Sequence, residues 1–223
     1  MSRDWHEWHR QYDDAASSLS RRLAEVRRQL GADLDARAAA GQRSVRLLSL
    51  CAGDGRDTIP VLAARPGLDV DACLVELDPT LADAARAAAA DVGVAVDVRT
   101  ADAGSPAAFR DRMVGDVLML CGIFGNISDP DVERCVRAAR AMLAPGGTVI
   151  WTRGGRVGPH DPSERVRGLF ASAGFDEVAF VAPAEASYPG GGQPLGRARR
   201  RPGAHVVVHV PGVSPSRTAC QPR

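Results

Sequence analysis

The sequence contains no lysine, so every basic side chain other than the five histidines is an arginine. Together with the abundant alanine, this usage indicates a GC-rich coding bias rather than a design for phosphate binding. Without lysine, Schiff-base chemistry that needs a side-chain amine is excluded. The formal net charge is only +1, so no overall field draws the chain to nucleic acid or to anionic membranes.

Long apolar runs and paired cysteines are also missing. No run approaches the length of a membrane-spanning helix, and residues 1–10 are polar and aromatic, unlike a signal peptide. We therefore expect a cytoplasmic protein with no membrane partner. The five cysteines are scattered and form no Cys-x-x-Cys pair, which argues against a disulfide framework and against a zinc site. No metal ion is expected.

The order of apolar segments predicts the fold class. A chain of 223 residues is long enough for one domain with a full core and too short for two comfortable ones. Between residues 45 and 152, short apolar runs alternate with helical patterns, which indicates βαβ units and a parallel sheet. Strands are expected at Val45–Leu50, Ala72–Leu77, Val94–Thr100, Asp116–Cys121 and Thr148–Thr152. Helices are expected at Asp57–Ala64, Thr80–Ala90 and Asp131–Leu143, the last capped by Ser128 or Asp129.

Further elements flank this block on both sides. An amphipathic helix is expected at Ser17–Ala40. After the block we expect a helix at Pro162–Ala173, which ends at Gly174, and strands at Glu177–Val181 and His205–Val210. The stretch 183–203 is rich in proline and glycine and is predicted to be a long loop, with the Arg197–Arg201 cluster on its solvated surface. The expected organisation is an N-terminal lid and helix over 1–42, a domain over 43–211 and a flexible tail over 212–223.

The first motif with chemical content follows the first strand. Leu50-Cys51-Ala52-Gly53-Asp54-Gly55 joins an apolar strand to a helix through two glycines. Glycine allows a tight turn and lets a ligand approach main-chain N–H groups. Packing between strand and helix explains such glycines equally well, so the motif needs a second signal.

That second signal is an acidic residue at the end of the next strand. Glu76 lies 23 residues after Gly53, where a carboxylate can accept hydrogen bonds from both ribose hydroxyls of an adenosine-containing ligand. Asp78, just before Pro79, is expected to cap the following helix instead. The third glycine of a dinucleotide fingerprint is absent, and Asp57 repels phosphate but suits an ammonium or sulfonium group. These features favour a sulfonium methyl donor over a nicotinamide dinucleotide.

From about residue 45 to residue 181, the chain resembles the class I S-adenosylmethionine-dependent methyltransferases. The resemblance rests on four segments in order: Cys51–Gly55, Glu76-Leu77-Asp78-Pro79, Asp102-Ala103 and Leu143-Ala144-Pro145-Gly146-Gly147. It implies a Rossmann-like three-layer α/β sandwich with a mostly parallel seven-stranded sheet, whose last strand, His205–Val210, runs antiparallel. It also implies that S-adenosylmethionine is the cofactor.

The resemblance also assigns roles to single residues. It implies that Cys51, Ala52 and Gly53 contact the methionyl part of the donor and that Glu76 binds the ribose. It implies that Leu77 and Ala103 pack on the adenine and that Asp102 accepts a hydrogen bond from the adenine amino group. The backbone of Cys121 would contact the donor near its reactive methyl group. The family often has an acid two residues before the loop and a glycine at its start, where this chain has Ser49 and Cys51. Asp57 is our candidate to replace the missing acid.

An aromatic segment precedes the predicted fold. Residues 4–13 hold two of the three tryptophans, two of the five histidines and one of the two tyrosines. This concentration suggests a lid over the donor, and similar segments cover the cofactor in small members of the family. Tyr12 is then a donor contact and Trp5 and Trp8 are acceptor contacts. The alternative is a staple that packs the N-terminal helix onto the domain.

Catalytic and acceptor-binding residues are harder to select. His9 is the favoured general base and His6 the reserve, because histidine titrates near neutrality; a purely structural histidine is the alternative. Phe124 and Asn126 after strand four and Arg153 after strand five are the other candidate acceptor contacts, and the last two suit a polar or carboxylate-bearing molecule.

The sequence therefore predicts a methyltransferase that acts on an oxygen or nitrogen nucleophile of a small molecule by in-line transfer, as a monomer or a homodimer. The Asp-Pro-Pro-Tyr type of signature is absent, which argues against flipped-base and planar amide substrates. A binding or regulatory protein that keeps the donor and transfers nothing is the alternative, since the base is uncertain. A nicotinamide oxidoreductase is disfavoured by the missing third glycine and by the Pro145-Gly146-Gly147 turn.

Overall fold

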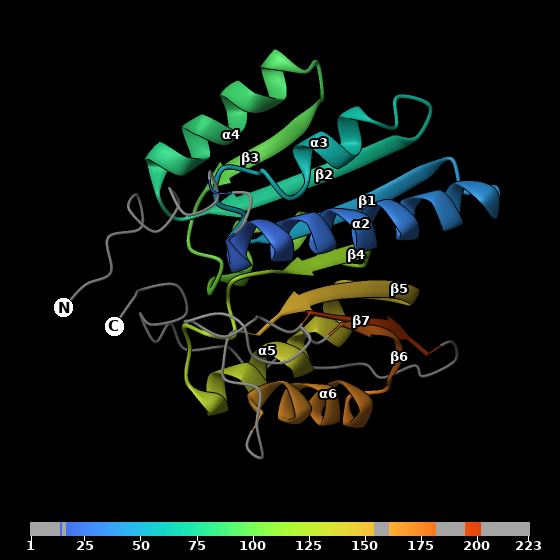
Figure 1. Cartoon of the computed structure of the whole chain (residues 1–223), viewed down its shortest axis with the longest axis vertical. Coiled ribbons are helices and arrows are strands. Elements are labelled where there is room, and N and C mark those ends of the chain that lie inside the picture. The colour runs from blue at the N-terminus through green and yellow to red at the C-terminus, as the bar shows by residue number, and fades with distance from the viewer. Residues whose placement is uncertain (1–13, 15–16, 154–160, 182–194, 202–223) are drawn as a thin grey trace.

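The computed structural model describes residue 14 and residues 17–153, 161–181 and 195–201. These residues form a seven-stranded sheet with the order β3-β2-β1-β4-β5-β7-β6 (Figure 1). The strands are β1 (Ser44–Leu50), β2 (Asp69–Glu76), β3 (Val96–Thr100), β4 (Gly115–Leu120), β5 (Leu143–Thr152), β6 (Phe175–Val181) and β7 (Leu195–Arg200). Neighbours among β1 to β5 pair in parallel, whereas β7 runs antiparallel to both β5 and β6. The predicted Rossmann-like α/β fold is confirmed.

Helices cover both faces of this sheet. They are α2 (Ser18–Ala39), α3 (Ile59–Ala63), α4 (Pro79–Asp91), α5 (Asp129–Met142) and α6 (Pro162–Ser172), with short 3₁₀ turns at Pro106–Ala108 and Arg110–Arg112. Buried side chains of α2, α3 and α4 share one core cluster with the sheet, and those of α5 and α6 share the other. The three layers follow from this division, because each helix buries one apolar stripe.

Side-chain caps and prolines set where the helices begin. The Ser17 side chain accepts a hydrogen bond from the Ser20 amide, and Asp78 accepts from the amides of Thr80 and Leu81. Ser128 caps α5 in the same manner. Each cap satisfies an N–H group that has no partner inside the helix. The predicted caps Asp78 and Ser128 are confirmed, and helix and strand positions through β6 agree with the sequence within a few residues.

The prediction for residues 183–203 is wrong in its last part. Leu195–Arg200 form β7, inserted between β5 and β6. Gly196 lies opposite Trp151 of β5, and a Cβ on Gly196 would overlap the indole ring. Arg197, expected on a solvated surface, has a side chain that is only 15% exposed. The strand predicted at His205–Val210 lies outside the described residues.

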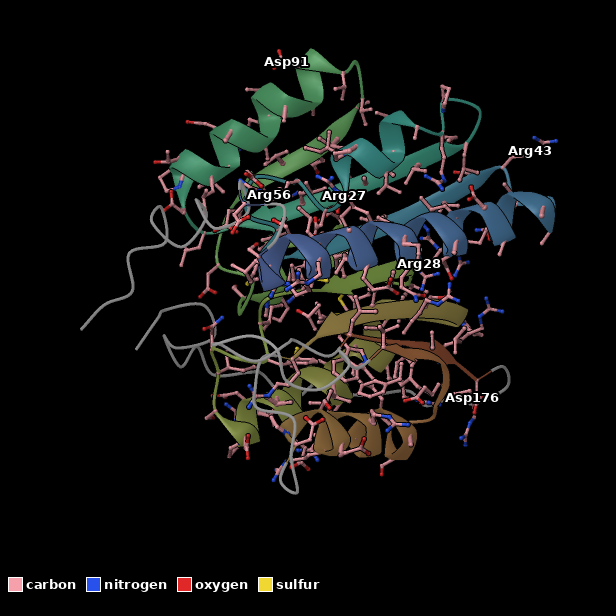
Figure 2. All side chains as sticks on the ribbon, in the orientation of Figure 1. Arg27, Arg28, Arg43, Arg56, Asp91 and Asp176 are labelled. Atoms are coloured by element: carbon pink, nitrogen blue, oxygen red, sulfur yellow. The ribbon has the colours of Figure 1, made fainter. Side chains whose placement is uncertain are left out.

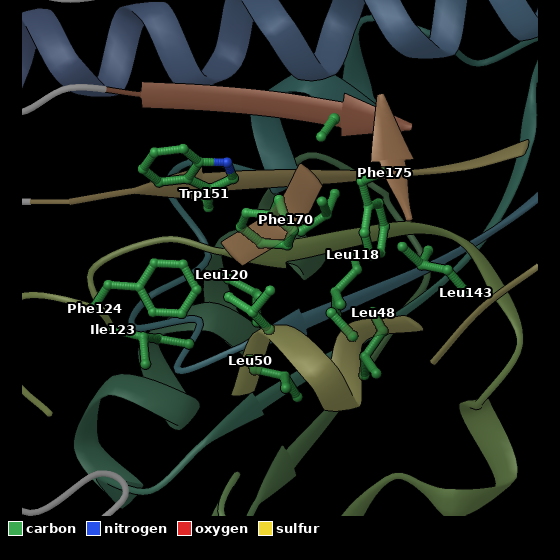
Figure 3. Close-up of a cluster of buried hydrophobic side chains, with 14 of the residues drawn as sticks. Leu48, Leu50, Leu118, Leu120, Ile123, Phe124, Leu143, Trp151, Phe170 and Phe175 are labelled. Atoms are coloured by element: carbon green, nitrogen blue, oxygen red, sulfur yellow. The ribbon is translucent and has the colours of Figure 1, made fainter. Parts of the chain in front are cut away.

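One aromatic cluster fills the core beneath α5 and α6. Trp151 stacks on Phe170 with ring centroids 5.8 Å apart, and Phe170 meets Phe175 edge to face at 5.3 Å (Figure 3). Leucines of β1 and β4 pack on the same cluster. Because these strands are covered on both faces, their residues alternate between two apolar cores, which explains their nearly continuous hydrophobic sequence.

A buried network of charged side chains attaches α2 to the face of the sheet opposite the aromatic cluster. Asp33 of α2 is 1% exposed and accepts hydrogen bonds from Arg37 Nε (2.7 Å) and from the Thr148 hydroxyl of β5 (2.8 Å). Arg37 Nη2 also donates to the Asp116 carbonyl at 3.0 Å. Arg197 of β7 lies 3.8 Å from Asp33. The N-terminal helix is thus tied to β4, β5 and β7 at once.

Candidate functional site

The site lies where β1, β2 and β4 end side by side. Its centre is Glu76, the last residue of β2, whose carboxylate accepts hydrogen bonds on both oxygens. Oε2 accepts from the Gly53 amide of the glycine loop at 2.7 Å, and Oε1 accepts from the Asp78 amide at 2.9 Å. Glu76 therefore links the loop after β1 to the turn after β2. The residue is only 9% exposed to solvent.

The loop from Cys51 to Gly55 has an unusual backbone. Cys51, Gly53 and Gly55 all have positive φ angles, of 54°, 59° and 70°. Cys51 is a non-glycine residue in the left-handed region, which costs about 1–2 kcal/mol. Glycine adopts this conformation without that cost. Three left-handed residues turn the chain sharply from β1 toward α3 and bring Gly53 to Glu76.

Residues after β2 and β3 form the adjoining part of the site. The side chain of Leu77 is 40% exposed, although it directly follows a buried strand. Asp102 and Ala103 are half-buried, and Asp102 Oδ1 accepts from the Gly104 amide at 2.7 Å. The Ala101 amide donates to the Glu76 carbonyl at 2.8 Å, which holds the two strand ends together. An exposed apolar side chain and a fixed carboxylate thus lie beside Glu76.

The end of β4 is held by two side chains. The Gly122 amide donates to the hydroxyl of Thr152, the last residue of β5, at 2.8 Å. The Asn126 side-chain amide donates to the Gly122 carbonyl at 2.6 Å. Asn126, expected to contact the acceptor, therefore fixes this turn. Thr152 was not anticipated from the sequence, because a threonine that ends a strand gives no separate signal.

Phe124 occupies a different place from the one expected. Its side chain is 0% exposed and packs in the aromatic cluster, with its ring 6.1 Å from that of Trp151 and 6.3 Å from that of Phe170 (Figure 3). The ring offers no surface to an acceptor. Its position after strand four, which suggested a substrate contact, instead places it under α6.

Three ionisable groups near the site have shifted pKa values. Burial raises the pKa of Asp57, against a hydrogen bond from the Thr58 hydroxyl at 2.9 Å and the charge of Arg22, which both lower it. Burial also raises the pKa of the Cys121 thiol. Arg153, which follows β5, is half-buried; burial lowers its pKa, and the charges of Asp129 and Asp161 oppose that change.

The predicted lid lies outside the described residues. This applies to the five residues assigned to it, Trp5, His6, Trp8, His9 and Tyr12. Within the described ranges, no group of three histidine, cysteine or acidic residues is placed to hold a metal ion. Likewise, no described helix has the length and apolar character needed to cross a bilayer.

Comparison with known proteins identifies a similar domain. A family model described as a methyltransferase domain matches residues 47–147. This range runs from β1 to the start of β5 and contains Glu76, the glycine loop and Asp102. Over these residues the chain is similar to methyltransferase domains. No curated protein matches it by sequence.

Solved methyltransferase structures share the fold. The chain superposes on magnesium protoporphyrin IX methyltransferase from Synechocystis PCC 6803 with bound SAH, with a TM-score of 0.63 and 14% identity over 88% of this chain and 93% of that one. For the mitomycin 7-O-methyltransferase the TM-score is 0.55, with 20% identity over 80% of this chain and 53% of that one. A protein from Bordetella parapertussis described as possibly exported has a TM-score of 0.57, with 18% identity over 81% of this chain and 67% of that one. At these identities the likeness concerns the fold.

Proposed function

We propose that the chain transfers the methyl group of S-adenosylmethionine to an oxygen or nitrogen nucleophile of a small molecule. The observation that carries this proposal is the position of Glu76. Its carboxylate lies at the junction of the glycine loop and the end of β2, fixed by the amides of Gly53 and Asp78. Each carboxylate oxygen has a further lone pair, so both ribose hydroxyls find an acceptor that is already oriented.

The surrounding residues fit an adenosyl group with a cationic end. Leu77 offers an exposed apolar side chain next to Glu76, suited to an adenine face. Asp102 supplies a fixed carboxylate for the adenine amino group. A Cβ on Gly122 would have no described atom within 4 Å, which leaves room beside the end of β4 for the reacting end of the ligand. Three carboxylates, those of Glu76, Asp57 and Asp102, disfavour a pyrophosphate here.

The protein's own contribution is alignment and exclusion of water. S-adenosylmethionine supplies an activated methyl group when bound, and the chain must hold the nucleophile in line with it. Thr152 and Asn126 fix the turn at Gly122, next to Cys121, whose backbone we assign to the reacting end. Arg153, half-buried at the end of β5, is the candidate to orient an anionic acceptor. A small-molecule acceptor is supported by the names of the porphyrin and mitomycin enzymes.

Replacement of Glu76 by alanine tests the donor site. We expect about a 100-fold or greater loss of S-adenosylhomocysteine affinity by calorimetric titration, because two charge-assisted hydrogen bonds of roughly 1.5–3 kcal/mol each disappear. Glu133→Ala, which removes a half-buried glutamate of α5 paired with Arg137, should leave the affinity unchanged. Equal affinity in Glu76→Ala and the wild type, or tight binding of NAD, would contradict the proposal.

Replacement of His9 by alanine tests the general base. We expect slower turnover with unchanged S-adenosylhomocysteine affinity, because a base acts only on the acceptor proton. The measurement is the conversion of S-adenosylmethionine to S-adenosylhomocysteine with acceptors found by screening phenols, carboxylates and amines. His6→Ala is the matched comparison. An unaffected rate in His9→Ala would pass the role to His6 or to no base at all, and failure of every acceptor would favour a non-transferring binding protein.

A further inference from the structure

Two arginines of β7 lie on the face of the sheet that α2 covers. Side chains alternate along a strand, and Leu195 belongs to the core cluster on the α2 face whereas Ala198 belongs to the cluster on the other face. Arg197 and Arg199 therefore share the face of Leu195. Each has one terminal nitrogen near Asp33 Oδ1 of α2, at 3.8 Å for Arg197 and at 4.0 Å for Arg199.

Arg197 is mostly buried and yet has no hydrogen-bond acceptor. Its side chain is 15% exposed, and its Nε is buried and unpartnered. In the part of the chain that the structure describes, its guanidinium donates no hydrogen bond, because the contact with Asp33 at 3.8 Å is too long for one. Arg112 and Arg200 also have an unpartnered Nε, but a terminal nitrogen of each donates to another group of the protein. A buried cation without acceptors is strongly disfavoured.

The carboxylates near these two arginines already have other partners. Both oxygens of Asp33 accept hydrogen bonds from the network that attaches α2 to the sheet. Glu25 of α2 accepts from Arg28 Nε at 2.8 Å, on the side of the helix that faces β5 (Figure 2). Asp176 of β6 accepts from Arg201 Nε at 2.7 Å. The acceptor that the arginines of β7 lack is therefore not supplied by these acids.

Positive charge is in excess at this position. Burial lowers the pKa of Arg197, the charge of Asp33 opposes this change, and the charges of three further arginines, led by Arg199, add to it. The side chain of Arg199 is 49% exposed, so the pair of guanidinium groups extends from the solvent toward the sheet. An anion that enters beside Arg199 would neutralise this charge and supply acceptors to both arginines.

The register of β7 separates this position from the donor site. Leu195 lies opposite Thr152, the last residue of β5, whereas Arg197 lies opposite Ile150 and Arg199 opposite Thr148. Each step along β7 leads away from the edge of the sheet that holds Glu76 and the glycine loop. A ligand bound by these arginines is thus distinct from the methyl donor.

We propose that Arg197 and Arg199 bind the phosphate group of a small molecule on the α2 face of the sheet. Guanidinium groups pair with phosphate oxygens in a bidentate manner, and two arginines on one face of a strand, two residues apart, can share one phosphate. The inference is independent of the proposed function. Nucleic acid is disfavoured as the source of the phosphate, because none of the described aromatic side chains is exposed for a base to stack on.

The test measures phosphate binding by the full chain. Calorimetric titrations use inorganic phosphate and glycerol 3-phosphate in chloride buffers of equal ionic strength. We expect saturable binding that Arg197→Gln and Arg199→Gln each weaken about 10–100-fold, as loss of a charged hydrogen-bond partner does. Arg201→Gln is the matched control, since it removes the same charge from an arginine paired with Asp176, and it should change the affinity less than about twofold. Tighter binding of the ester would identify a phosphate ester as the ligand, and equal binding would identify free phosphate.

Other outcomes of these titrations overturn the inference. Absence of saturable binding of both compounds to the wild-type protein does so, and so does an equal loss in Arg201→Gln, which would reflect overall charge. Binding of an oligonucleotide but of neither small phosphate would assign the surface to nucleic acid instead. The affinity for S-adenosylhomocysteine should be unchanged in Arg197→Gln, and a loss would place Arg197 in the donor site.

A melting experiment separates a ligand site from a structural role. In phosphate-free buffer we expect Arg197→Gln to melt at a higher temperature than the wild type, because a buried cation without hydrogen bonds is removed, as is common where function opposes stability. Added phosphate should then raise the melting temperature of the wild type and not that of the variant. A lower melting temperature of Arg197→Gln without phosphate would show that Asp33 already satisfies Arg197, which contradicts the inference.

Discussion

Replacement of Asp33 by asparagine is expected to lower the free energy of unfolding by about 3–5 kcal/mol, the range for removing one partner of a buried ion pair. The substitution keeps the size and shape of the side chain and removes only its charge. Arg37, with a side chain that is 10% exposed, would then lose its closest carboxylate and keep only that of Asp116, whose Oδ1 lies 3.8 Å from Nη1. Equilibrium unfolding in urea measures the effect through the transition midpoint.

A second aspartate on the same helix provides the control. Asp35 also pairs with an arginine, Arg65, at 2.8 Å, but its side chain is 64% exposed. Asp35→Asn should therefore cost no more than about 1 kcal/mol, as is typical of pairs in water. Raised salt should reduce the small effect of Asp35→Asn and leave that of Asp33→Asn almost unchanged. Equal costs for the two substitutions would show that Asp33 does not anchor α2.

Replacement of Gly55 by alanine should lower the free energy of unfolding about as much as Asp33→Asn, for a steric reason. Gly55 has φ +70°, and a Cβ there would lie 2.5 Å from Ile59 Cδ1 and 3.0 Å from Leu74 Cδ2. Both neighbours are buried and cannot move outward. We expect a loss of about 2–5 kcal/mol, from backbone strain and overpacking together, and a large loss of S-adenosylhomocysteine affinity because the loop is displaced from Glu76.

Gly41 separates the two contributions. It also has a positive φ, of +84°, but a Cβ there would have no described atom within 4 Å. Gly41→Ala should thus report backbone strain alone, about 1–2 kcal/mol, with unchanged ligand affinity. The comparison by urea unfolding and titration assigns the difference to the contact with Ile59 and Leu74. A Gly55→Ala protein no less stable than Gly41→Ala would contradict the packing described for the loop.

Local patterns were sufficient to predict most of the fold. Apolar runs such as those of β1 and β2 are covered on both faces, and caps such as Asp78 act within one helical turn, so both leave a signal in adjacent residues. β7 leaves no such signal. Its sequence LGRARR reads as a polar loop, and it forms a strand because Gly196 fits under Trp151 and Arg197 lies near Asp33. Those partners are distant in sequence.

The candidate site also has features that the sequence predicted and features that it did not. Spacing in the sequence was sufficient to select Glu76 and the glycine loop as candidates, because the fold fixes the distance from the first strand to the end of the second. The hydrogen bonds from Gly53 and Asp78 to Glu76 were not predicted, since β1 and β2 must pair before these groups meet. Phe124 was predicted to contact the acceptor but lies in the core, because an aromatic residue after a strand suits a core as well as a pocket.

The place of β7 in the sheet also bears on how the protein is made. This strand is synthesised after β5 and β6 yet lies between them, so neither can complete its hydrogen bonds until residue 200 has left the ribosome. Until then the sides of β5 and β6 that face β7 in the complete sheet have no partner strand, and unpaired strand edges promote aggregation between chains. A chain that stops before residue 195 would contain Glu76 and the glycine loop and still lack the strand that joins β6 to the rest of the sheet.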